Sequence, residues 1–176
     1  MALVQVLPRR LAGWIATEPD WDEVYAAELP RVLNFFRYRL GHDTEAEDLT
    51  ARTFEKAWRA RHRYRRDLAG LSTWLLTIAR HVAIDHLRTQ QRHETLNAAA
   101  AVPSPEHTPE HLVIQQSDAQ RLAGLLATLE PRQRELIAMK YGAGMTNRAI
   151  AQATGLSESN VGTILHRAVE ILRGRW

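Results

Sequence analysis

The 176-residue sequence contains no cysteine, which excludes a disulfide-stabilised fold, thiol catalysis and any metal centre with cysteine ligands. It also lacks an apolar run of the ~20 residues that a membrane-spanning helix needs. The apolar stretch 2–7 is too short for a signal peptide, and Pro8, Arg9 and Arg10 follow it. These absences predict a cytoplasmic protein without membrane insertion.

The usual motifs of enzymes are missing as well. The sequence has no glycine-rich phosphate loop and no HExxH pair. His107 and His111 are four residues apart, but they flank Pro109 in a segment with the composition of a linker, so we expect no metal site there. No nucleophile is paired with a base and an orienting group at a recognisable spacing. The sequence therefore predicts a binding protein and not an enzyme, with no catalytic residue, no metal and no cofactor.

The net charge of +3 conceals an alternation of charge along the chain. Residues 18–58 carry −5 and residues 93–131 carry −4, whereas residues 59–92 carry +6 and residues 132–176 carry +4. Arginine provides 21 of the 23 basic residues, and its guanidinium group suits bidentate contacts with phosphate and guanine. Two basic blocks favour two contacts with a polyanion, although solvated charged faces would give the same pattern.

The first half of the chain has the apolar periodicity of helices. One apolar stripe runs from Trp21 to Leu40 and ends at Gly41, and Pro30 within it predicts a kink or two abutting helices. Thr44 and Glu47 have capping-box spacing and open a second predicted helix, 44–58. Ser72 is the predicted N-cap of a third helix, whose inward positions are Trp74, Leu75, Ile78, Ala79, Val82 and Leu87. Its predicted solvent-exposed side carries Arg80, His81, Arg88 and Arg92.

The second half begins with a change of composition. Residues 93–111 contain three prolines and an alanine run, which predicts a flexible linker. A further helix is expected at about 110–128, and Pro131 is well placed at the first position of the next one.

The last 45 residues have the spacing of a helix-turn-helix. Thr146 is predicted to cap a short helix, Gly155 to make the turn, and Ser157 to cap the final helix. The inward stripe of that helix is Val161, Leu165, Ala168 and Leu172. A generic helical hairpin would share this periodicity. The predicted fold class is all-α, with two small helical domains joined by a flexible linker and a C-terminal helix-turn-helix.

Three stretches carry a resemblance to a known family. The first is Ala46-Glu47-Asp48-Leu49-Thr50, followed by Thr53-Phe54 and Ala57-Trp58. The second runs from Thr73 to His81 and continues through Asp85-His86-Leu87-Arg88. The third runs from Leu129 to Leu136, includes Ile150-Ala151 and Gly155-Leu156-Ser157, and ends in Leu165-His166-Arg167-Ala168. In this order and spacing they resemble bacterial sigma factors of the extracytoplasmic-function (ECF) type, in the sigma-70 family.

The resemblance implies an N-terminal extension (1–20), a region 2-like domain (21–92), the linker (93–111) and a region 4-like helix-turn-helix domain (112–176). It implies a sigma factor that binds core RNA polymerase through the β′ clamp and β subunits. The region 2-like domain would recognise and melt the −10 promoter element, and the region 4-like domain would bind the −35 element. Family members are commonly held inactive by an anti-sigma factor, so such a partner is possible here.

The resemblance also assigns three sets of site residues. Polymerase docking is placed on Glu45, Glu47, Asp48, Leu49, Thr53 and Phe54, although Leu49, Phe54 and Trp58 also suit the core. Contacts with the −10 element are placed on Tyr64, Arg65, Arg66, Ser72, Thr73, Arg80, His81 and Arg88. The interleaved aromatic and basic residues of 59–66 independently suit single-stranded DNA. Contacts with the −35 element are placed on Thr146, Arg148, Ser157, Ser159, Asn160, Thr163, His166 and Arg167.

The sequence departs from the family pattern at a few of these places. Leu71 and His81 stand where the family commonly has phenylalanine and asparagine, which leaves the identity of the recognised base open. The segment 162–164 has no basic residue, so fewer phosphate contacts and a shallower salt dependence are expected. Two other functions therefore remain as alternatives: a stand-alone helix-turn-helix regulator, and a polymerase-docking adaptor without promoter recognition.

Overall fold

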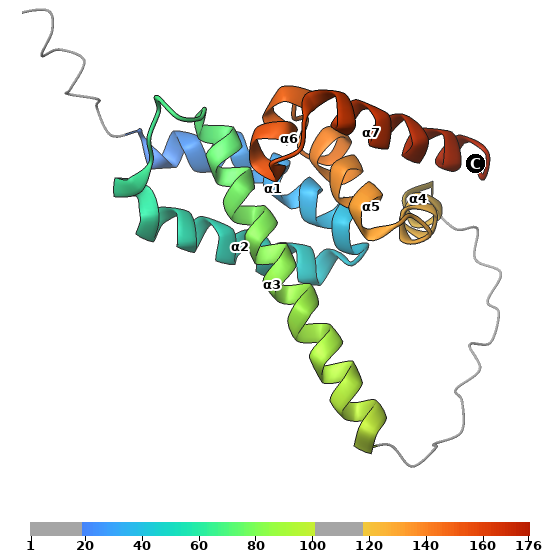
Figure 1. The fold of residues 1–176 in the computed structure, drawn as a ribbon. Helices are drawn as coiled ribbons and strands as arrows, with labels where there is room; N and C mark the ends of the chain where they lie inside the picture. The colour runs from blue at the N-terminus through green and yellow to red at the C-terminus, as the bar shows by residue number, and fades with distance from the viewer. Residues whose placement is uncertain (1–18, 101–117) are drawn as a thin grey trace, which may run out of the picture.

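A computed structural model describes residues 19–100 and 118–176, and every regular element in these ranges is a helix (Figure 1). The N-terminal unit, residues 19–100, contains α1 (Trp21–Leu40), α2 (Asp43–Ala60), the short 3₁₀ helix η1 (Arg61–Arg63) and α3 (Leu71–Ala100). The C-terminal unit, residues 118–176, contains α4 (Asp118–Ala127), α5 (Pro131–Ile137), the π-helix η2 (Ala138–Gly142), α6 (Asn147–Thr154) and α7 (Glu158–Arg173). The predicted all-α class is confirmed, while residues 1–18 of the predicted extension 1–20, and residues 101–117, lie outside the described residues.

Helix α1 begins and ends where its sequence signals predict. The Asp20 carboxylate accepts a hydrogen bond from the Asp22 N–H at 3.0 Å, and Gly41 ends the helix in the left-handed conformation with φ of 83°. Of the two outcomes expected at Pro30, a pair of abutting helices is wrong, because α1 is a single helix of 20 residues that contains Pro30. Pro30 lies on the exposed face, so its ring does not disturb the packing of the opposite, buried face.

The starts of α2 and α3 differ from the prediction. Thr44 does not cap α2, because the helix begins one residue earlier and its N-cap is His42, without a side-chain cap bond. Ser72 does not cap α3 either: the Gly70 carbonyl already accepts the first backbone bond, from the Trp74 N–H at 3.0 Å. Helix α3 also runs to Ala100, well into the segment expected to be linker, and its C-terminal end projects beyond the rest of the fold in Figure 1.

The C-terminal unit is a helix-turn-helix built on two supporting helices. Pro131 occupies the first turn of α5, and the Gln133 side chain accepts a bond from the Glu130 N–H at 3.3 Å. Thr146 and Ser157 cap α6 and α7 through bonds of 3.1 and 3.2 Å from the Ala149 and Asn160 N–H groups. The predicted caps of the helix-turn-helix are thus confirmed, as is its turn at Gly155, which has φ of 74°.

One continuous core joins the two units. Phe35 and Phe36 of α1 belong to the same buried cluster as Leu136 of α5 and Met139 of η2. The π-helix places Gly142 directly against α1, where a Cβ atom would lie 2.8 Å from the Asn34 carbonyl oxygen. Because only a glycine permits this approach, the units are packed backbone to backbone at this point.

Candidate polymerase and nucleic-acid interfaces

The amino-terminal half of α2 is acidic on its outer face, and this half carries three of the residues predicted to dock on polymerase. Glu47 and Asp48 are exposed, and Glu45 accepts a hydrogen bond from the Gln90 amide of α3 at 3.2 Å. The other three predicted docking residues, Leu49, Thr53 and Phe54, are buried in this structure, with 2%, 0% and 8% of their surface exposed. These three side chains pack on the inner side of α2, and the acidic face consists of the carboxylates of Glu45, Glu47 and Asp48. The expected core position of Trp58 is wrong, since Trp58 is 49% exposed.

The segment after α2 combines guanidinium groups with aromatic rings. Arg65 donates two hydrogen bonds to Asp67, at 2.8 and 3.0 Å, and Arg66 is exposed. The hydrogen bond from Arg65 lowers the pKa of the Asp67 carboxyl below its usual value, and the same bond raises the pKa of Arg65. Since both groups are exposed, the pair is weak and leaves Arg65 available to a competing anion.

An aromatic cluster lies beside this basic segment. The ring of Tyr64 is 5.3 Å from that of Trp74, which itself lies 6.4 Å from Trp21. Trp21 also meets Trp58 edge to face at 5.7 Å. The half-buried Trp74 packs on the core as expected, while the exposed Trp58 carries the Arg61 guanidinium over its ring, 4.0 Å from the ring centroid.

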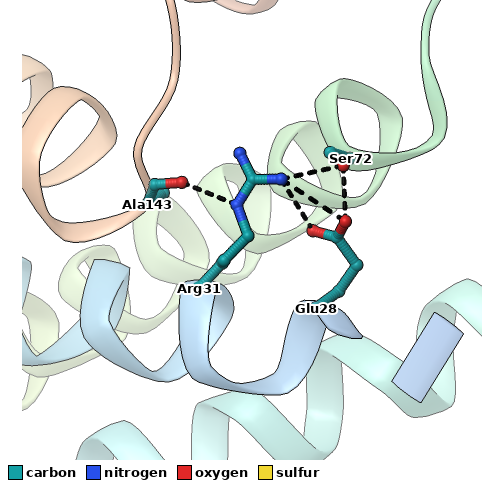
Figure 2. A network of polar contacts seen from close by, with 4 residues as sticks. All are labelled: Glu28, Arg31, Ser72 and Ala143. Carbon is teal, nitrogen blue, oxygen red and sulfur yellow. Dashed lines mark hydrogen bonds and ion pairs between the residues drawn. The ribbon is translucent and has the colours of Figure 1, made fainter. Parts of the chain in front are cut away.

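Ser72 takes part in a polar network between helices and not in a helix cap (Figure 2). Its hydroxyl donates to the Glu28 carboxylate and accepts a hydrogen bond from Arg31 at 3.0 Å. Arg31 in turn donates from Nε to the Ala143 carbonyl oxygen of the C-terminal unit at 2.8 Å. Glu28 is buried, so this network places a charged pair in the seam between the units.

Arg80, like Ser72, is a predicted −10 residue whose side chain is bonded to other side chains of the protein. It was expected on the solvent-exposed side of α3, but its side chain is only 16% exposed and donates to Glu135 at 2.8 Å. Glu135 also accepts from Arg132 at 2.8 Å, and both of its oxygens are thereby used. The expectation fails because Glu135 of α5 reaches Arg80 and supplies a buried carboxylate there. By contrast, His81 and Arg88 are exposed, as predicted, and Thr73 is half-buried.

One further guanidinium group, that of Arg39, lies close to this carboxylate, and that of Arg134 lies close to Arg39. Burial lowers the pKa of Arg39 below its ordinary value; the nearby Glu135 opposes this shift, and Arg80 adds to it. Burial and the proximity of Arg39 likewise lower the pKa of Arg134, which donates to the Tyr38 carbonyl oxygen at 3.4 Å. The seam is therefore rich in partly desolvated arginine.

The helix-turn-helix presents one continuous polar face. The predicted −35 residues exposed on it are Thr146, Arg148, Ser157, Ser159, Asn160, Thr163, His166 and Arg167. Val161, Leu165 and Ala168 point into the core, and Leu172 is half-buried, so the predicted amphipathic division of α7 is confirmed. Thr163 donates to the Ser159 carbonyl oxygen at 3.1 Å, which leaves Asn160, His166 and Arg167 as the longer polar side chains of this face.

Sequence reasoning missed the residues that connect the units: Glu28, Arg31, Glu135 and Gly142. A charged residue at an apolar-stripe position was the available signal for Glu28, which lies one turn after Val24 and one before Val32.

Within the described ranges, no group of three or more histidine and acidic side chains could hold a metal ion. No helix in these ranges combines the length and apolarity of a membrane span.

Two family models match most of the described chain. A model of sigma-70 region 2 matches residues 24–93, and a model of sigma-70 region 4 matches residues 119–172. ECF RNA polymerase sigma factor SigX of Bacillus subtilis is 30% identical over 162 residues, which cover 89% of this chain and 83% of SigX. ECF RNA polymerase sigma factor BldN of Streptomyces coelicolor is 27% identical over 173 residues, 97% of this chain but only 64% of BldN.

Solved structures support the same fold. The sigma factor RpoE of Bartonella quintana, in complex with the anti-sigma factor NepR, superposes with a TM-score of 0.72 at 23% identity, covering 88% of this chain and 95% of that one. CnrH, in complex with the cytosolic domain of CnrY, has a TM-score of 0.59 at 21% identity, covering 95% and 88%. The fold and the two matched regions define a helical transcription factor of the helix-turn-helix class. The chain belongs to the sigma-70 family, in its extracytoplasmic-function group.

Proposed function

We propose that this chain binds core RNA polymerase and directs it to specific promoters. The observation that supports the proposal best is the presence of three separate polar surfaces on one small fold. These are the acidic face of α2, the arginine and aromatic segment between α2 and α3, and the polar face of α6 and α7. A stand-alone repressor needs only the last of them.

Each surface suits a different partner. The carboxylates Glu45, Glu47 and Asp48 repel DNA and suit a basic protein surface, for which we propose the β′ clamp of polymerase. The segment with Tyr64, Arg65 and Arg66 suits an unpaired −10 strand, because bases stack on aromatic rings and phosphates pair with guanidinium groups. In this scheme the protein acts in the cytoplasm, performs no chemistry of its own, and leaves RNA synthesis to polymerase.

The C-terminal unit fits the major groove of duplex DNA, and we assign it to the −35 element. The amino-terminal half of α7 carries Ser159, Asn160 and Thr163 at its outer face and no arginine or lysine, so direct phosphate pairing from this half is sparse. The unit therefore binds DNA weakly alone and gains avidity when polymerase holds the other surfaces in place. An anti-sigma factor is a further proposed partner, since the superposed sigma factor RpoE was solved in complex with the anti-sigma factor NepR.

Run-off transcription tests the proposal. The purified chain is added to core polymerase on fragmented genomic DNA of its own organism, and transcripts that depend on the chain are mapped. We expect promoter-dependent products and a stable complex with core polymerase. Absence of any chain-dependent product would contradict promoter recognition, and polymerase binding without product would favour an adaptor. Tight operator binding without polymerase would favour a stand-alone regulator.

Paired alanine substitutions locate strand opening. Arg65→Ala with Arg66→Ala removes two charge-assisted contacts of about 1 kcal/mol each, so the open complex should fall by about thirty-fold. Permanganate reactivity of unpaired thymines measures it, and polymerase binding should be unchanged. Arg173→Ala with Arg175→Ala removes the same charge from the far end of α7 and serves as the matched control. Equal strand opening by both double variants would argue against a −10 role for Arg65 and Arg66.

A further inference from the structure

Four aromatic rings form one strip where α1 and α2 pack together. The members of this aromatic strip are Trp21, Tyr25, Phe54 and Trp58. The Tyr25 ring lies 4.7 Å from the Phe54 ring. The Trp21 ring lies 5.7 Å from the Trp58 ring, and each helix contributes two rings one turn apart, so the two contacts are neighbours. Tyr25 and Trp58 are 48% and 49% exposed, which makes the strip a docking surface for an apolar partner.

The exposed charges in the first turn of α1, beside this strip, are acidic. Asp22 and Glu23 lie between Trp21 and Tyr25 in the sequence, and both are exposed. Neither carboxylate has an ion-pair partner in the part of the chain that the structure describes. Unpaired carboxylates repel nucleic acid and attract basic groups, so the strip suits a partner that combines apolar residues with basic ones.

The segment 1–17 of this chain has that composition. It carries two arginines, Arg9 and Arg10, and no acidic residue. One apolar series in it repeats at intervals of three or four residues, which is the spacing that places side chains on one face of a helix. The members of this apolar series are Leu3, Leu7, Leu11 and Trp14. A segment with this pattern gains free energy by burying its apolar side on another surface.

The segment is also tethered directly to the aromatic strip. Residue 19 is the first described residue, and it lies two positions before Trp21, which belongs to the strip. Trp14, the nearest member of the apolar series, is seven residues from Trp21 and therefore lies within about 25 Å of it. A tether of this length gives an effective concentration in the millimolar range, which favours this segment over a second copy of the chain or a free protein.

We propose that the segment 1–17 binds to the aromatic strip of the same chain. Its apolar series covers the half-exposed rings of Tyr25 and Trp58, and its two arginines face the carboxylates of Asp22 and Glu23. The bound segment keeps other apolar partners away from the strip. This inference does not depend on the proposed function, because the contact lies within one chain and needs neither polymerase nor DNA.

Paramagnetic broadening of NMR signals tests the proposal, and the absence of native cysteine allows a single nitroxide label. The label is attached to Gln5→Cys, outside the apolar series, and the reporter is the indole N–H signal of Trp58. A free tether of 16 residues would keep the label about 20 Å from Trp21 on average, whereas docking brings it to the strip. The indole signal of Trp176, beyond the end of α7, is the internal reference.

Two variants of the labelled chain show whether the apolar series makes the contact. Leu7→Ser with Leu11→Ser removes two apolar contacts and keeps the length of the tether. Leu96→Ser, the same change at a 60% exposed residue of α3, is the matched control. We expect the broadening of the Trp58 signal to fall at least threefold with the two serines and to stay unchanged with Leu96→Ser. Equal broadening with and without the two serines would overturn the proposal.

A mixed sample distinguishes a contact within one chain from a contact between two copies. Nitroxide-labelled chain is mixed with isotope-labelled chain that has no nitroxide, and we expect no broadening of the Trp58 signal. Broadening in this mixture would assign the strip to a second copy and overturn the contact within one chain. None of these outcomes bears on promoter recognition, which run-off transcription tests separately.

The charge of α1 is tested in the same labelled chain. Asp22→Asn with Glu23→Gln removes both carboxylates, and exposed ion pairs contribute 0.2–1 kcal/mol each, so the broadening of the Trp58 signal should fall by about twofold at low salt. High salt should reduce the broadening of the unsubstituted chain in the same way. Broadening that is unchanged by both treatments would overturn the pairing of the two arginines with α1.

Discussion

Replacing Glu135 with glutamine removes the negative charge between Arg80 and Arg132 while keeping the size of the side chain and one acceptor oxygen. The side chains of Arg80 and Glu135 are 16% and 7% exposed, so solvent screens their interaction only slightly. A charge-assisted hydrogen bond in such a setting contributes about 2 kcal/mol. Glu135→Gln alone should cost about 3 kcal/mol, since Arg80 is left with no anion among other guanidinium groups.

A double-mutant cycle isolates the contact between the units. The second substitution is Arg80→Met, which keeps the length of the side chain and removes its charge. Urea unfolding followed by tryptophan fluorescence gives the free energy of unfolding for the wild type, both single variants and the double variant. We expect a coupling energy of about 2 kcal/mol, well above the 0.2–1 kcal/mol typical of exposed ion pairs.

A second cycle, with Arg132 in place of Arg80, measures the contact of Glu135 inside the C-terminal unit. Arg132 is 40% exposed and belongs to the same helix as Glu135, so its coupling should lie near 0.5 kcal/mol and fall with added salt. The Arg80 coupling should persist at high salt because the pair is buried. An Arg80 coupling below about 0.5 kcal/mol would refute the argument that Glu135 holds the two units together.

Two further predictions concern other parts of the fold. Gly155→Ala should destabilise the chain by about 1 kcal/mol, because φ is 74° at this turn. Gly124→Ala should stabilise the chain by about 1 kcal/mol, because Gly124 lies within α4 with open space around it. Equal shifts of Tm for the two variants would contradict this prediction. In an NMR pH series the pKa of the Asp67 carboxyl should lie below its ordinary value, because its ionised form accepts hydrogen bonds from Arg65. The ion pair between Asp67 and Arg65 is therefore present at neutral pH and lost as the pH falls through the lowered pKa of Asp67. Arg65→Ala should return the pKa of Asp67 to its ordinary value, and a titration curve unchanged by this substitution would refute the pairing.

Local signals predicted the helices of this protein well, because they act over one turn of chain. Thr146, Gly155 and Ser157 each make the cap or turn that their residue type favours. Prediction failed where a tertiary contact outweighs the local signal. Ser72 is a good capping residue, but a buried carboxylate at Glu28 and the guanidinium of Arg31 provide stronger partners for its hydroxyl.

The site was harder to predict than the fold, for a reason that Arg80 illustrates. Helical periodicity shows which face of α3 is apolar, and it correctly leaves His81 and Arg88 in solvent. It cannot show that Glu135 of α5 pairs with Arg80, because this partner is 55 residues away in the sequence. Charge at a helical position therefore predicts a polar environment, and only the fold decides whether water, protein or DNA provides it.

The alternating charge of the sequence has a structural explanation in the contact between the two units. Arg80 lies in the basic block 59–92, but its partner Glu135 is an acid within the other basic block, 132–176. Two basic surfaces repel one another, so their close packing requires an acid placed between them. Glu135 meets that need with a single carboxylate, and the arginines around it remain in excess.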